Sequence, residues 1–231
     1  MSETARDRIL ARLQGAPRQE TPRPESPVPA AAAPDRDARV ARLKSLMEAV
    51  RAEVHVLPAA EWIPRLKEVL GARAIKTLLY APDTDLGFAL AEAWQQDAAG
   101  LPELVAYADP VESFKERLFG VDAAVTAAAG AVADTGALIL RPTAAEPRLM
   151  SLVPPVHIAV LKADTVFTSL ADAMREGRWA EGMPSNMLLV SGPSKTADIE
   201  LILAFGVHGP KELVVLIVER GAKGSRVRGF K

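Results

Sequence analysis

The chain has 231 residues, of which 49% are hydrophobic and 25% charged, and its formal net charge is −1. This length and balance fit one α/β domain with a full hydrophobic core. A charge so close to zero does not favour nucleic acid or an anionic membrane as a partner. No apolar run is long enough to span a bilayer, and the first residues lack the apolar core of a signal peptide. We therefore expect a cytoplasmic protein.

The sequence contains no cysteine. This chain therefore has no disulfide, no thiolate zinc site, no all-cysteine iron–sulfur cluster and no cysteine nucleophile. Its three histidines, His55, His157 and His208, are far apart in the sequence and form no HxxxH pair. The sequence thus predicts no metal site and no cofactor bound by this chain.

The N-terminal part divides into two segments. Apolar residues at Ile9, Leu10 and Leu13 predict a short amphipathic helix within residues 1–14. Residues 15–34 are rich in proline and alanine, which predicts an extended linker. Two interpretations of the helix stay open: it docks on the body, another subunit or a partner, or it is a frayed tail.

Residues 35–231 are predicted to form the domain itself, in which helical and strand-like segments alternate. Helical spacing of apolar residues appears over 37–54, 61–70, 85–96 and 110–118. Short apolar runs predict strands at 77–80, 105–107, 123–126, 137–140, 157–161, 187–190 and 213–218. Continuous apolar strands separated by helices indicate a mainly parallel sheet covered on both faces, which is a doubly wound α/β fold.

The loop after the strand predicted at 187–190 is the first candidate ligand site. It leads into a helix predicted over 197–205, and loops that leave the carboxyl ends of strands commonly hold ligands in open sheets. A helix N-terminus also attracts anions, so a small phosphate or carboxylate would suit this place. The candidate ligand-binding residues here are Ser191, Gly192, Ser194, Lys195, Thr196 and Asp198.

The alternative interpretation of this loop is a capped turn without a ligand. Ser194 or Thr196 would cap the helix, and Asp198 in the first turn would repel an anion. The loop matches neither GxxxxGK[ST] nor GxGxxG.

Two further turns carry candidate residues. Asp134, Thr135 and Gly136 precede an apolar strand, where Asp134 is a candidate general base and the other two are candidate ligand contacts. A single copy of this turn excludes the carboxylate pair of an aspartic protease. His208 lies in the second turn as a candidate acid or base, and Gly209 after it is a candidate ligand contact.

For both turns the alternative is that the side chains only satisfy backbone groups. If the turns carry chemistry, we expect Asp134, Lys195 and His208 to surround one cleft, with Asp134 and His208 as the candidate catalytic residues.

Taken in chain order, four segments together resemble the LUD-domain family. They are residues 133–136, 152–157, 191–200 and 206–210, and the resemblance extends over 35–219. It implies a fold similar to the NagB/RpiA/CoA-transferase-like group. It also implies similarity to the lactate utilization protein C group, whose members act with iron–sulfur partner proteins in the oxidation of L-lactate to pyruvate.

On this resemblance the partners carry the clusters, and it assigns no catalytic residue to this chain. The alternatives are a stand-alone enzyme or binding protein for a phosphorylated, nucleotide or acyl-CoA ligand, and a non-catalytic scaffold.

Overall fold

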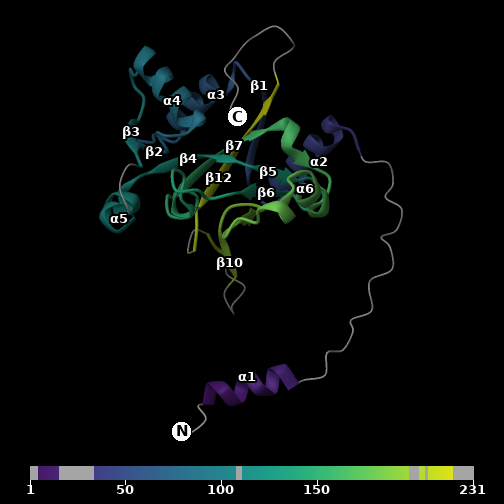
Figure 1. Ribbon diagram of the computed structural model, residues 1–231. Coiled ribbons are helices and arrows are strands. Elements are labelled where there is room, and N and C mark those ends of the chain that lie inside the picture. Colours follow the sequence, from purple (N-terminus) through teal and green to yellow (C-terminus); the bar gives the residue numbers. More distant parts are fainter. Residues whose placement is uncertain (1–4, 16–33, 108–110, 198–202, 206–207, 221–231) are drawn as a thin grey trace. The chain divides into compact units, whose positions relative to one another are not determined.

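A computed structural model describes residues 5–15, 34–107, 111–197, 203–205 and 208–220 (Figure 1). The chain divides into two compact units, Met1–Ala33 and Pro34–Lys231. The first unit contains helix α1 (Ala5–Gly15), whose Ile9 and Leu13 side chains are exposed. Most of the segment predicted to be a linker lies outside the described residues. Within the part of the chain that the structure describes, no helix combines the length and apolar character that crossing a membrane takes.

The second unit is built on a six-stranded sheet in which every neighbouring pair of strands is parallel. Its order is β1 (Glu53–Pro58), β12 (Glu212–Glu219), β7 (Val156–Lys162), β4 (Ala123–Ala128), β2 (Thr77–Tyr80) and β3 (Glu103–Ala106). The central strand β7 is buried at every position except its last, which is the pattern of a strand covered on both faces. The mainly parallel sheet predicted from the sequence is confirmed.

Helices cover both faces of this sheet. Helices α3 (Trp62–Ala72) and α4 (Asp85–Gln96) pack against one face, where their apolar side chains meet Ile158 of β7. Helix α2 (Arg36–Ala49) packs on the other face against Ala159, the next residue of the same strand. Helix α5 (Val111–Gly120) covers β2 and β3 on that second face. Figure 1 shows α3 and α4 on one side of the strands and α2 on the other, so the fold is doubly wound.

A smaller four-stranded sheet packs on the α2 side of the parallel sheet. Its order is β8 (Val166–Phe167), β5 (Gly130–Val132), β6 (Ala137–Leu140) and β9 (Leu188–Val190). Helix α6 (Leu170–Glu176) lies beside it and begins at a capping box formed by Ser169 and Asp172. The described residues also contain three short 3₁₀ helices, η1 (Arg148–Ser151), η2 (Ala163–Thr165) and η3 (Trp179–Glu181).

Strand β9 corrects one prediction. The sequence pattern indicated a buried strand followed by a helix and a neighbouring parallel strand. Instead β9 is the last strand of the smaller sheet, antiparallel to β6, and the side chain of Leu189 is 51% exposed. It therefore does not belong to the parallel sheet.

The helix predicted over 197–205 is also wrong. The chain forms two short antiparallel strands there, β10 (Lys195–Ala197) and β11 (Leu203–Phe205), and residues 198–202 lie outside the described part. The apolar residues at 199, 201, 203 and 205 also alternate with period two, so the pattern fits a strand as well as a helix. Without a helix at 197, the loop from Ser191 does not lead into a positive helix end.

Candidate functional site

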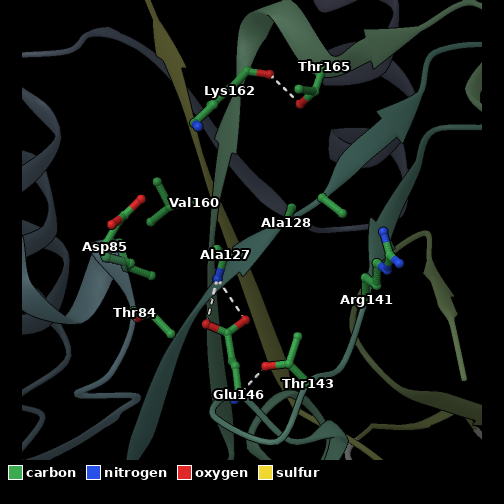
Figure 2. A pocket seen from close by; sticks show the side chains of 12 residues that line it. Thr84, Asp85, Ala127, Ala128, Arg141, Thr143, Glu146, Val160, Lys162 and Thr165 are labelled. Atoms are coloured by element: carbon green, nitrogen blue, oxygen red, sulfur yellow. Dashed lines mark hydrogen bonds between the residues drawn. The ribbon is translucent and has the colours of Figure 1, made fainter. Parts of the chain in front are cut away.

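A cavity of about 420 Å³ lies at the carboxyl ends of the central strands β4 and β7 (Figure 2). From β2 the chain runs outward to β3 through α4 on one face, whereas from β4 it leaves through the smaller sheet on the other face. The connections after β2 and β4 thus diverge, which opens a crevice at the point where the strand order reverses. This is the usual position of ligands in open α/β sheets.

Four separate segments line the cavity. They are the start of α4, the end of β4, the segment that follows β6, and the end of β7 with the residues after it. The lining residues are Thr84, Asp85, Leu86, Ala127, Ala128, Ala129, Arg141, Thr143, Glu146, Val160, Lys162 and Thr165.

Two cationic side chains enter the cavity from different elements. Lys162, the last residue of β7, lies on the same side as Asp85, and Arg141 lies on the opposite side (Figure 2). Burial lowers the pKa of Lys162, and the charge of Asp85 partly opposes this effect. An anion held between them would meet the half-buried ammonium group of Lys162 and the exposed guanidinium group of Arg141.

The start of helix α4 forms one wall. Thr84 caps this helix, because its hydroxyl accepts a hydrogen bond of 3.0 Å from the backbone N–H of Gly87. The capped first turn places Asp85 and Leu86 at the cavity. The positive end of the helix dipole therefore faces the cavity, while the Asp85 carboxylate offsets it.

Glu146 is the acid in the floor of the cavity. The backbone N–H of Ala127 donates to both of its carboxylate oxygens, at 3.1 and 3.2 Å. Two bonds with Thr143 close the turn that carries Glu146: the Glu146 N–H donates to the Thr143 hydroxyl, and the Thr143 N–H donates to the Glu146 carbonyl, each at 3.0 Å. Burial raises the pKa of Glu146 to about 7, although the Ala127 hydrogen bond acts in the opposite direction.

This arrangement can bind an anion and exchange a proton beside it. A carboxyl group with a pKa near 7 is present in both protonation states at neutral pH, which suits a general acid or base. Lys162, Arg141 and Glu146 line the same cavity, so a ligand carboxylate or phosphate bound there would lie among two cations and this acid. Among the described residues, no three histidine, aspartate or glutamate side chains gather in a way that could hold a metal ion.

The loop and turn selected from the sequence form a different cavity, at the amino ends of β7 and β12. Ser191, Gly192, Ser194, His208 and Gly209 all line this space of about 210 Å³. The backbone N–H of Ser194 donates to the carbonyl of Pro210 at 2.8 Å, which joins the loop to the turn. The structure therefore brings these predicted residues together, but at the edge of the sheet opposite to the crevice.

The remaining predicted residues lie elsewhere. Lys195 and Thr196 belong to β10, with the Lys195 side chain exposed, and Asp198 lies outside the described residues. Asp134 and Thr135 are exposed in the turn between β5 and β6, and do not line the cavity that contains His208.

The Asp134–Gly136 turn has a structural role in the fold. The Asp134 N–H donates to the carbonyl of Thr168 at 3.0 Å. Gly136 has a φ of +64°, and a Cβ atom there would lie 2.6 Å from the Cβ of Leu46 on α2. Glycine is thus required where this turn meets α2.

His157 is buried beside the amino-end cavity. Its Nε2 shares a hydrogen bond of 2.8 Å with the hydroxyl of Thr126 on β4, and burial lowers its pKa to about 4. A neutral histidine with a buried partner is typical of a core position.

Sequence reasoning missed the residues of the crevice. Lys162 is the first charged residue after the apolar run of β7, and Asp85 follows the β2 strand by a few residues. Ligands commonly lie at the carboxyl ends of parallel strands, so a search after β7 and β2 would have selected both Lys162 and Asp85. Glu146 lies in an irregular segment after β6 and has no comparable signal in the sequence.

Comparison with known proteins places this architecture in a family. The LUD domain model matches residues 40–218 of the chain. The chain belongs to the LUD-domain family. One relative is an uncharacterized protein of Neisseria meningitidis serogroup B, 35% identical over 186 residues that make up 78% of each chain.

A second relative is named for a process. It is the lactate utilization protein C of Deinococcus radiodurans, 40% identical over 104 residues, which are 42% of this chain and 46% of the relative. A solved structure, of a DUF162 family protein from Deinococcus radiodurans, matches with a TM-score of 0.54 and 21% identity. The match covers 80% of this LUD-domain chain and 99% of the solved one, so the two share the fold.

Proposed function

We propose that this chain is a component of an L-lactate utilisation system and binds the carboxylate of the substrate in the crevice at the ends of β4 and β7. The observation that carries the proposal is that Lys162, Arg141 and Glu146, an acid of pKa about 7, line one cavity. A relative named lactate utilization protein C supports the assignment to this process.

The groups of the cavity match those of a 2-hydroxy acid. The carboxylate of L-lactate would pair with Lys162 and Arg141, and its hydroxyl would hydrogen-bond to Glu146. Oxidation to pyruvate releases two electrons and two protons: ionised Glu146 would accept the hydroxyl proton, and the C2 proton and the two electrons would pass to acceptors of the partner proteins. We further propose that iron–sulfur partner proteins receive the electrons, since this chain has no cysteine to hold an all-cysteine cluster.

The test combines binding with growth. Calorimetry should detect L-lactate and pyruvate binding to the purified protein, with affinity at least about tenfold weaker in Lys162→Met because one charge-assisted hydrogen bond is lost. Lys76→Met, outside the cavity, serves as the matched control. A strain without the gene should fail to grow on L-lactate, and the Lys162→Met copy should restore growth poorly. Normal growth of the deletion strain would refute the assignment to lactate utilisation.

A second candidate is a phosphorylated, nucleotide or acyl-CoA ligand. A cavity of about 420 Å³ has the size of sites that hold whole cofactors or drug-sized molecules, and it lies against the first turn of α4. The Asp85 carboxylate in that turn disfavours a multiply charged phosphate, so we place this candidate second. Titration with inorganic phosphate, ADP and coenzyme A beside L-lactate decides between the two.

A further inference from the structure

A smaller apolar cavity adjoins the crevice. Its volume is about 120 Å³, and it shares two lining residues, Ala129 and Arg141, with the larger cavity. Its other walls come from the smaller sheet, from α6 and from the segment after it. These residues are Ile139, Phe167, Ala173, Gly177, Trp179 and Met187. Apart from Arg141 at the junction, no charged side chain of the described residues lines it.

The walls of this apolar cavity are packed parts of the fold. Ile139 and Ala173 are buried, and Phe167, Trp179 and Met187 pack against them. A Cβ atom at Gly177 would lie 2.5 Å from Nε1 of Trp179, so the indole ring rests against the glycine backbone at the end of α6. The ring of Phe167 is held in the same way, since a Cβ at Gly130 would lie 2.8 Å from its Cε2 atom. The cavity therefore has two aromatic walls whose positions are fixed by close backbone contacts.

Arg141 and Ala129 connect a charged space with an apolar one. Because Arg141 and Ala129 line both spaces, the carbon chain of a ligand whose carboxylate pairs with Arg141 could extend from the crevice toward the apolar cavity. The methyl group of lactate is too small to fill 120 Å³. The apolar space would then remain unused.

We propose that the two cavities form one bipartite site, and that the ligand class extends beyond L-lactate to 2-hydroxy and 2-oxo carboxylates whose side chain is larger and more apolar than methyl. This inference rests on the proposed function, because it takes the carboxylate to bind at Lys162 and Arg141. The aromatic walls and Met187 then receive the side chain of the acid. Burial of each further methylene strengthens binding about fourfold when water is excluded around it.

The test measures binding of two acids that differ only in side chain. We expect L-2-hydroxy-4-methylpentanoate, which has three more carbons than L-lactate, to bind at least about tenfold more tightly in calorimetry. Ala173→Leu fills the apolar cavity from α6 and should remove this advantage while leaving the affinity for L-lactate within about twofold. Ala171→Leu is the matched control, because Ala171 is exposed on the same helix and lines neither cavity. Thermal unfolding of both variants reports whether they fold.

The outcomes separate this inference from the function it rests on. If L-lactate binds and the larger acid binds no better, the bipartite site is refuted and the carboxylate site stands. If neither acid binds, the carboxylate site fails, and the inference falls with it. If Ala173→Leu does not fold, Met187→Ala changes another lining residue of the apolar cavity, just before β9. This variant should weaken binding of the larger acid and leave binding of L-lactate unchanged. If Ala173→Leu or Met187→Ala folds and still binds the larger acid more tightly than L-lactate by the wild-type factor, the proposal is also overturned.

Discussion

Replacing Glu146 with glutamine should change how the stability of the protein depends on pH. Below pH 4.5 the carboxyl group is protonated in both the folded and the unfolded chain. Between pH 4.5 and about 7 the unfolded chain releases this proton while the folded protein keeps it, so the free energy of unfolding falls as pH rises. Above about pH 7 both states are ionised, and this contribution stays lost. Glutamine cannot ionise, yet its amide oxygen can still accept from the Ala127 N–H.

The size of the effect follows from the pKa of Glu146. A rise from 4.5 to about 7 corresponds to about 3 kcal/mol, because one pKa unit is worth about 1.4 kcal/mol. Glu146 is half-buried at an open cavity, so solvent screening reduces the expected difference to about 2 kcal/mol.

Urea unfolding of the wild type and Glu146→Gln at pH 5, 6, 7 and 8 measures this difference. The wild type should lose about 2 kcal/mol relative to the variant between the first and last pH. Glu92→Gln, an exposed carboxylate on α4, is the control for removing one negative charge. Parallel pH curves for the wild type and Glu146→Gln would refute the assignment of a burial-raised pKa to this residue.

Two further predictions concern positions outside the crevice. Gly136→Ala should destabilise the protein by about 2 kcal/mol in urea unfolding, because the positive φ of Gly136 and its contact with Leu46 both exclude a Cβ atom. The control is Gly71→Ala, inside helix α3 with open space around it, which should be neutral or stabilising. Thr126→Val should cost about 1–3 kcal/mol, because it leaves the buried Nε2 of His157 without its partner, and an equal stability of this variant and the wild type would contradict that reasoning.

The regular part of the fold was predictable because its elements carry local signals. The strands predicted at 77–80 and 137–140 coincide with β2 and β6, and the helix predicted at 85–96 coincides with α4. Each strand is an apolar run, and α4 begins directly after a capping threonine. Strand β1 was missed because the predicted helix ran on to residue 54. In the turn that ends α2, Arg51 adopts the left-handed region with a φ of 72°. Because this residue is neither glycine nor proline, the sequence gives no local signal for the turn.

The candidate site was harder to predict because its position depends on tertiary structure. The rule that ligands bind at the carboxyl ends of parallel strands is sound, but it was applied to β9, which is antiparallel to β6 in the smaller sheet. Membership of a sheet is not visible in a three-residue strand. The same limit applies to Glu146, whose raised pKa comes from burial by segments that the sequence does not place beside it.

The position of β12 in the sheet has a consequence for biosynthesis. Strand β1 is the edge strand of its sheet and, among the described residues, pairs with β12 alone; Glu53 pairs with Val214, which is distant from it in the sequence. Until β12 has been synthesised, β1 has no neighbouring strand. The side of β7 that pairs with β12 in the folded sheet is also unpaired. The nascent protein must therefore hold β1 without its neighbouring strand until synthesis has passed residue 219, and this interval is when chaperones would be needed most.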